Sequence, residues 1–196
     1  MKTVFIICGP ESSGNRLTRM ILKSIPILEV GNDYERAMRM FEEKRDIDLM
    51  KENTWLFAGR SIPHGGTFGN REKVPEYLSL DKYEKAFINF GFKPKWIIPI
   101  RSIYPLMKSK MARKRTPIGV RENDAAMYQF ISGQYLHIFS GLVDIGDAIF
   151  HLFNTSALML NPDRELMGLE KFFGFELDIK RIKKEIYDAD AKHYER

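Results

Sequence analysis

The sequence predicts a single α/β domain with three layers (α/β/α), in which a central parallel β-sheet lies between helices. Short apolar runs, typical of strands buried on both faces, alternate along the chain with longer segments whose apolar residues recur at helical spacing. No internal repeat, low-complexity tract or linker separates these segments. The 196 residues are 44% hydrophobic and 29% charged, as expected for a chain with one core. Residues 1–196 are therefore expected to form one domain.

The beginning of the chain predicts a strand, a turn and a helix in direct succession. Residues 4–8 are a continuous apolar run rich in β-branched side chains. Residues 9–14 contain two glycines, one proline and two serines, which favour a turn. Apolar residues at helical spacing then predict a helix over residues 15–25, ended by Pro26.

The same patterns assign the remaining elements. Strands are assigned to short apolar runs and helices to amphipathic segments, one of which ends at Gly174. In chain order, the expected elements are helix 33–49, strand 55–58, the glycine-rich loop 60–70, helix 80–90, strand 96–100, helix 104–115, helix 124–142, strand 148–153, helix 164–173 and the partly helical segment 178–196. Because strands alternate with helices, a parallel sheet is expected.

Composition and charge restrict the classes of partner. The formal net charge is +5 and the isoelectric point is near 9.2, which indicates an anionic ligand or partner. No interleaving of aromatic and basic residues supports a nucleic-acid partner. No apolar stretch reaches the roughly 18 uninterrupted residues of a membrane-spanning helix. The single cysteine, Cys8, cannot form an internal disulfide, which predicts a reducing, cytoplasmic compartment.

The turn over residues 9–14 is a candidate anion-binding loop. Main-chain N–H groups of a tight turn, followed by the positive end of a helix dipole, bind anions without side-chain charge. Gly9 and Gly14 would let the backbone approach the anion, and the neighbouring side chains add neutral donors and a forked cation: Ser12, Ser13, Asn15 and Arg16. The spacing is that of a Walker phosphate loop, but Asn15 and Arg16 replace its Lys and its Ser or Thr, which weakens a triphosphate interpretation. A simple strand-to-helix turn is the alternative.

A second feature lies halfway along the chain. The strand 96–100 ends at Arg101, and Ser109 follows eight residues later in the next helix. Together with the loop, this arrangement resembles the P-loop-like sulfotransferases that use 3′-phosphoadenosine 5′-phosphosulfate (PAPS). Asn161-Pro162, the helix after it and Gly174-Phe175 resemble the closing segment of that family. The resemblance covers most of the chain and implies a P-loop NTPase-like topology.

The resemblance implies roles for these residues. The glycine loop would bind the 5′-phosphosulfate, and Arg101 with Ser109 would bind the 3′-phosphate. The implied cofactor-binding residues are Gly9, Ser12, Ser13, Gly14, Asn15, Arg16, Leu17, Arg101 and Ser109. Neither the histidines nor Cys8 show metal-ligand spacing, so no metal is expected.

The catalytic residues are less clearly marked, because the sequence departs from the family here. Many members have a Lys or Arg in the loop where this chain has Ser12, so Arg16 or Arg60 would have to stabilise the leaving group. His64 is the candidate general base, since its intrinsic pKa suits proton transfer near neutrality. An alternative alignment puts Ser61 at the base position instead.

The resulting hypothesis is transfer of a sulfuryl group from PAPS to a hydroxyl or amine of a small molecule or glycan. Two alternatives remain open. A P-loop nucleotide kinase or triphosphatase with a degenerate loop would need a strand that ends in Asp for magnesium, but the three apolar strands are followed by Gly9, Gly59 and Arg101. A noncatalytic nucleotide-binding relative would retain the anion pocket without turnover.

Overall fold

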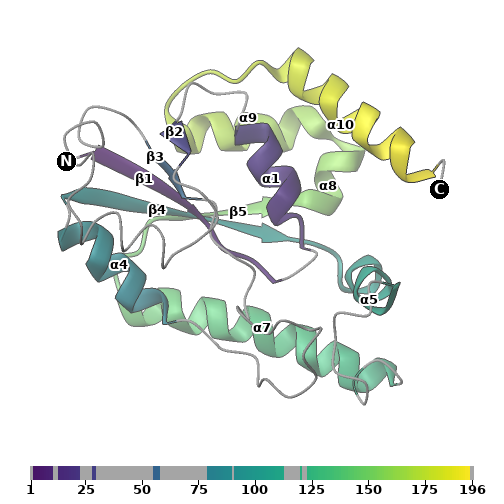
Figure 1. Cartoon of the computed structure of the whole chain (residues 1–196), viewed down its shortest axis with the longest axis horizontal. Helices are drawn as coiled ribbons and strands as arrows, with labels where there is room; N and C mark the ends of the chain where they lie inside the picture. Colours follow the sequence, from purple (N-terminus) through teal and green to yellow (C-terminus); the bar gives the residue numbers. More distant parts are fainter. Residues whose placement is uncertain are drawn as a thin grey trace.

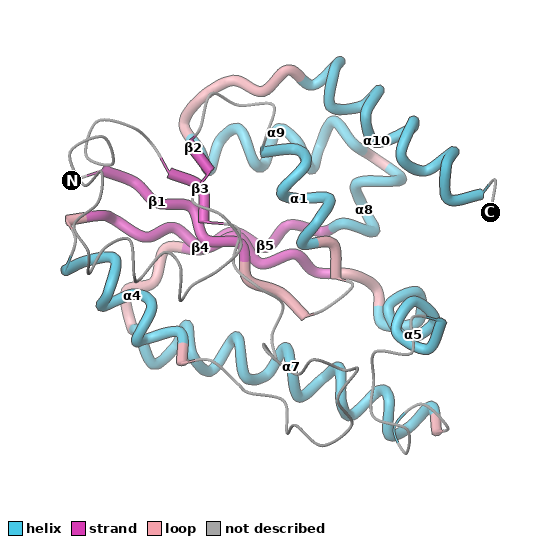
Figure 2. The backbone as a smooth tube through the Cα atoms, in the orientation of Figure 1, coloured by secondary structure: helices cyan, strands magenta, loops and turns pink. Residues whose placement is uncertain are grey.

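The central feature of the fold is a parallel sheet with strand order β2-β3-β1-β4-β5. The structure, a computed structural model, describes residues 2–10, 13–22, 28–29, 55–57, 79–89, 91–112, 120 and 123–194. The strands within these ranges are β1 (Lys2–Ile7), β2 (Leu28–Glu29), β3 (Trp55–Phe57), β4 (Phe92–Ile100) and β5 (Phe150–Asn154). Every adjacent pair is parallel, so the strands all end at one edge of the sheet. The arrows of Figure 1 give the strand direction, and Figure 2 shows the strands side by side in magenta.

Helices cover both faces of this sheet, as Figure 1 shows. The described helices are α1 (Asn15–Leu22), α4 (Leu80–Asn89), α5 (Ile103–Ala112), α7 (Asp124–Ile145), α8 (Thr155–Leu160), α9 (Pro162–Phe173) and α10 (Ile179–Tyr194). Helices α4 and α7 lie on one face, and α1, α8, α9 and α10 lie on the other, while α5 follows the end of β4 (Figure 1). The predicted three-layer α/β fold with a parallel sheet is confirmed.

The alternation of side chains along β1 explains the two layers of core. Val4 and Ile6 pack in one cluster with α4 and α7, whereas Phe5 and Ile7 pack in another with α1, α8, α9 and α10. All four side chains are almost completely buried. A strand segment buried on both faces is expected to be apolar at every position, as β1 is from Val4 to Ile7.

Local signals define where several helices begin and end. The side chains of Asn123, Asn154 and Asn161 cap the N-termini of α7, α8 and α9 by accepting hydrogen bonds from backbone N–H groups. Gly174 ends α9 in the left-handed conformation, with φ of 80°, which glycine adopts without steric strain. None of the helices in the described ranges is long and apolar enough to cross a membrane.

The observed boundaries differ from the expected ones in informative ways. β4 begins at Phe92 instead of residue 96, because Lys93 and Lys95 alternate with the buried Phe92 and Pro94 and break the apolar run. The six-residue helix α8 was not expected at all, since it is too short to display a period. The expected helix 33–49 and loop 60–70 lie outside the described residues.

Candidate functional site

The sheet topology brings the two predicted anion-binding segments to the same edge. β1 and β4 are hydrogen-bonded neighbours, with Ile7 opposite Ile97. The loop after β1 and the segment that begins at Arg101 after β4 therefore leave the same edge of the sheet. β5 ends beside them, because Asn154 lies opposite Ile100. This edge, formed by the carboxyl ends of β1, β4 and β5, is where parallel α/β sheets bind ligands.

Both glycines of the loop occupy positions where a larger residue would force neighbouring side chains to move. Gly14 has a φ of +117°, and a Cβ atom there would lie 2.4 Å from Cγ2 of Thr155. A Cβ atom on Gly9 would lie 2.6 Å from Oγ of Ser13 and 2.8 Å from Oδ1 of Asn15. The loop thus needs glycine for two reasons, a backbone conformation at one end and close packing at both.

Side chains of the loop and of α1 hold its shape. Nδ2 of Asn15 donates hydrogen bonds to the carbonyl oxygens of Gly9 (2.9 Å) and Pro10 (3.3 Å). The N–H of Thr18 and its hydroxyl both donate to the carbonyl oxygen of Gly14, at 2.8 Å and 3.0 Å. The Asn15 amide nitrogen, which the sequence suggested as a donor to the anion, is therefore directed at the loop's own carbonyls.

The loop retains groups that suit a bound anion. Ser13 is fully buried, and within the described part of the chain its hydroxyl oxygen has no hydrogen-bond partner. The first N–H groups of α1 have no acceptor within their own helix, and Arg16 lies exposed on that first turn. Leaving a buried hydroxyl unpaired costs about 1–3 kcal/mol. A phosphate-type oxygen would satisfy Ser13, so the loop fits an anion.

Arg101 has a closely defined backbone. Its N–H donates to the hydroxyl oxygen of Tyr135 on α7, at 3.1 Å. Burial raises the pKa of Tyr135, an effect that the hydrogen bond and the positive charge of Arg101 partly oppose. The tyrosine therefore stays neutral at physiological pH. Ser109 is half-buried on α5, the helix that leaves this same edge.

The basic residues beside Ser109 have separate surroundings. Nζ of Lys108 lies 4.6 Å from the ring centroid of Tyr104, and the Lys108 side chain is exposed. Lys110 is buried and lies 5.4 Å from the ring centroid of Phe130. Of these two lysines, only Lys108 is accessible to an approaching anion.

Three predicted residues lie outside the described part of the chain. They are Ser12, Arg60 and His64. Their roles stay predictions, as does that of Ser61. Of the catalytic candidates, only Arg16 is described, and it lies at the expected edge.

Sequence reasoning missed three side chains that shape the site: Tyr135, Thr155 and Ser156. The Ser156 hydroxyl accepts from the N–H of Ser102 at 3.0 Å. Thr155 donates to the carbonyl oxygens of Ser13 in the loop and of Ile100 at the end of β4. A usable signal existed, because Asn154-Thr155-Ser156 directly follows an apolar strand and the carboxyl ends of parallel strands meet at one edge.

Among the described residues, neither Cys8 nor His151 belongs to a reactive centre. Cys8 is buried, and burial raises the pKa of its thiol, which keeps it neutral. His151 stacks on Phe172 with ring centroids 5.3 Å apart, and burial lowers its pKa. The described ranges contain no cluster of three or more His, Cys, Asp or Glu side chains able to hold a metal ion.

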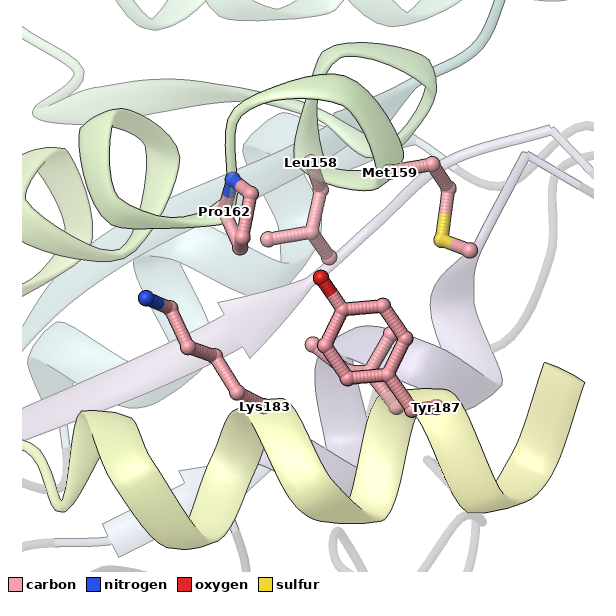
Figure 3. Close-up of a pocket in the computed structure, with 6 residues that line it drawn as sticks. Leu158, Met159, Pro162, Lys183 and Tyr187 are labelled. Atoms are coloured by element: carbon pink, nitrogen blue, oxygen red, sulfur yellow. The ribbon is translucent and has the colours of Figure 1, made fainter.

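A small pocket lies away from this edge, between α8, α9 and α10 (Figure 3). Its lining residues are Leu158, Met159, Pro162, Lys183, Ile186 and Tyr187. Nζ of Lys183 is already engaged by Asp163 at 2.7 Å. This pocket is a gap between packed helices and does not belong to the candidate site.

Comparisons with known proteins agree with the geometry. No protein-family model matches the sequence, and no curated protein matches it either. Among solved structures, mouse sulfotransferase SULT7A1 complexed with PAP aligns with 93% of this chain, with a TM-score of 0.54 and 14% identity. The sulfotransferase domain of the Synechococcus PCC 7002 olefin synthase aligns with 91% of it (TM-score 0.52, 14% identity). The sulfotransferase domain from the curacin biosynthetic pathway also aligns with 91% (TM-score 0.51, 13% identity).

The chain has the sulfotransferase fold. It spans 62% of the length of the mouse protein and 74% and 76% of the two biosynthetic domains. The predicted P-loop-like sulfotransferase fold is thus confirmed. The roles inferred for the loop and for Arg101 with Ser109 stay predictions.

Proposed function

We propose that this chain is a sulfotransferase that binds PAPS and transfers its sulfuryl group to a hydroxyl or amine of a small molecule or glycan. The observation that supports it most is that the glycine loop, with its main-chain N–H groups, and the segment that carries Arg101 lie at the same edge of the sheet. There, β1 leads into the glycine loop and its neighbour β4 leads into Arg101. The solved structure of mouse SULT7A1, which shares the fold, contains PAP.

The residues divide by the part of the nucleotide they would hold. Loop N–H groups, Ser13, the first turn of α1 with Leu17, and Arg16 would bind the 5′-phosphosulfate, for which the buried, unpaired Ser13 hydroxyl is suited. Arg101 and Ser109 would bind the 3′-phosphate, since a guanidinium forms paired hydrogen bonds with phosphate oxygens. Asn15 would act indirectly, by holding the loop carbonyls away from the anion.

When bound, PAPS supplies an activated sulfuryl group whose sulfur–oxygen bond to the phosphate breaks as the acceptor oxygen or nitrogen bonds to sulfur. Arg16, with Arg60 as the other candidate, would stabilise the negative charge that remains on the phosphate. His64 would take the proton from the acceptor. The proposed compartment is cytoplasmic, in keeping with a single buried cysteine.

Titration calorimetry with PAP tests the donor site. We expect wild type to bind PAP and Arg101→Ala to bind it about 10- to 100-fold more weakly, as for loss of a charge-assisted contact. Adenosine 5′-monophosphate (AMP), which lacks the 3′-phosphate, should be affected much less. Arg181→Ala is the matched control, because Arg181 is exposed on α10 and pairs with Glu185. Absence of PAP binding to wild type, or equal binding by both variants, would refute the proposal.

Ser12 in place of a loop cation favours a second candidate, a noncatalytic nucleotide-binding relative. The two candidates differ in turnover. Radiolabelled PAPS incubated with a panel of hydroxyl and amine acceptors should yield labelled product if the chain is an enzyme. Tight PAP binding without any transfer would favour the noncatalytic relative.

A further inference from the structure

We infer that Thr155 is a positioning residue that holds the glycine loop and the Arg101 segment in one fixed relation to each other. It acts through the backbone of both segments and does not need to touch the nucleotide. The inference rests on the proposed function, because it concerns how the same nucleotide site is built.

The hydroxyl of Thr155 lies between two backbone carbonyls. Oγ1 is 2.7 Å from the carbonyl oxygen of Ser13 and 2.9 Å from that of Ile100. Thr155 is only 5% exposed. Since a hydroxyl has one hydrogen, the two carbonyls share it. The hydroxyl is therefore held in place by both segments at once.

These three residues come from separate parts of the sheet edge. Ser13 belongs to the loop after β1, Ile100 is the last residue of β4, and Thr155 directly follows β5. β1 and β5 are not neighbours, because β4 lies between them. Thr155, at the end of β5, thus links the loop after β1 to the end of β4.

The methyl group of Thr155 makes a second contact with the loop. Its Cγ2 atom lies 2.4 Å from the position that a Cβ atom on Gly14 would occupy. The backbone at Gly14 therefore packs directly against Thr155, which fills the space that a side chain at position 14 would need. Both ends of the threonine side chain face the loop.

The backbone around Arg101 is hydrogen-bonded to side chains at three successive residues. Thr155 holds the carbonyl of Ile100, the hydroxyl of Tyr135 accepts from the N–H of Arg101, and Ser156 accepts from the N–H of Ser102. The direction in which the Arg101 side chain leaves the backbone is defined by these ties. Of the three side chains, Thr155 is the one whose hydroxyl also bonds to the loop.

Thr155 is itself rigidly placed at the start of α8. Oδ1 of Asn154 accepts from the N–H groups of Ser156 (3.1 Å) and Ala157 (2.9 Å). The N–H of Asn154 donates to Oε2 of Glu165 on α9, at 3.3 Å. Because Thr155 is fixed in this way, its hydroxyl holds the loop and the end of β4 in a constant relation to each other.

This role predicts a specific loss. The two phosphates of PAP are held at a separation set by the nucleotide, so a shift between the loop and Arg101 weakens binding of PAP more than that of AMP. Thr155→Val removes the hydroxyl and keeps the shape. We expect it to weaken PAP binding about tenfold, the effect of one hydrogen bond, with a smaller change for AMP. Thr155→Ser retains the hydroxyl and should restore PAP affinity close to that of wild type.

The experiment is calorimetric titration of PAP and AMP into wild type, Thr155→Val, Thr155→Ser and Arg101→Ala, with thermal unfolding to establish that each variant is folded. Thr155→Ala replaces the valine variant if the latter does not fold. The double variant Thr155→Val/Arg101→Ala should lose less than the product of the two single effects, because the threonine acts partly through the arginine.

The outcomes separate this inference from the proposed function. If wild type does not bind PAP, the proposed function fails. If wild type binds PAP and Arg101→Ala weakens it, but Thr155→Val binds PAP as wild type does, the inference alone is wrong. Equal losses of PAP and AMP affinity in Thr155→Val, without rescue by Thr155→Ser, would also overturn it.

Discussion

Ser13 and Gly14 are the two loop residues whose local structure bears most on the proposed anion site. Ser13 has a buried hydroxyl that no described protein group pairs, and Gly14 has a φ of +117°. The first feature costs stability unless a ligand supplies a partner, and the second is tolerated because glycine lacks a Cβ atom. The glycine conformation is common to many tight turns, so the unpaired hydroxyl of Ser13 is the feature that favours a bound anion.

We predict opposite effects of two glycine-to-alanine changes on the free energy of unfolding. Gly14→Ala would force alanine into a left-handed backbone conformation and against Thr155. We expect the free energy of unfolding to fall by about 1–3 kcal/mol and PAP affinity to fall at least tenfold. Urea unfolding and calorimetry measure the two effects.

Gly133→Ala is the matched control for that experiment. Gly133 lies within α7, and a Cβ atom there would have no atom within 4 Å besides those of its chain neighbours and of its own helix backbone. Alanine should raise the free energy of unfolding by about 0.5–1 kcal/mol, because it favours the helix more than glycine does. Gly14→Ala as stable as wild type would show that the loop tolerates a side chain.

The elements of the fold depend on asparagine at several helix starts. Oδ1 of Asn123 accepts hydrogen bonds from the N–H groups of Ala125 (2.8 Å) and Ala126 (3.1 Å) at the start of α7. That helix supplies Tyr135, which holds the backbone of Arg101. A helix cap therefore contributes indirectly to the site, by stabilising the element that reaches it.

For this element we predict a modest effect of Asn123→Ala. Loss of the cap should lower the free energy of unfolding by about 1 kcal/mol, as measured by urea unfolding. Asn123→Asp should be close to wild type, since it keeps the acceptor and adds a negative charge at the positive end of the helix. An alanine variant as stable as the aspartate variant would contradict this assignment of the cap.

The molecule as a whole is organised around a sheet whose two faces are covered and whose carboxyl edge carries the loops. Two charged side chains are buried among the described residues, Lys110 on α5 and Glu84 on α4. Oε2 of Glu84 on α4 accepts a hydrogen bond from Nε1 of Trp96 on β4, at 2.7 Å. Burial raises the pKa of Glu84, and the negative charges of Asp147 and Asp81 raise it further. The hydrogen bond from Trp96 lowers the pKa but does not cancel the rise. The sheet and α4 are thus joined by a group that titrates.

Glu84 predicts a pH dependence of global stability. Its pKa in the folded state is above its ordinary value of 4.5, so the folded state binds this proton more tightly than the unfolded state. The stabilisation is complete below about the ordinary value and is lost as pH rises through the raised value. Glu84→Gln keeps an acceptor for Trp96 and cannot ionise.

We therefore expect the stability of wild type relative to Glu84→Gln to decline as pH rises, with the glutamine variant the more stable at neutral pH. Urea unfolding across a pH series measures this difference, and the exposed Glu176→Gln is the control. Parallel stability curves for wild type and Glu84→Gln would show that Glu84 does not titrate as proposed.

Several features of this fold were predictable because they depend on neighbouring residues. The apolar run of β1, the glycines of the loop and the position of Arg101 after β4 are local patterns, and each appears in the structure where expected. The extent of β4 was misjudged, because whether Lys93 or Lys95 can lie in a strand depends on what covers each face. The catalytic candidates Arg60 and His64 remain predictions.

The amino-acid sequence by itself determined most of the order of strands and helices, though not β2 or α8. It also determined the glycine loop and its resemblance to a nucleotide-binding loop. Only the tertiary structure decided that β4 lies between β1 and β5, and that Thr155, 142 residues from Ser13 and 55 from Ile100, bonds to both. The physical reason is the range of the interactions. Turn and strand preferences arise within a few residues, whereas a hydrogen bond between distant segments exists only once the sheet has brought their backbones together.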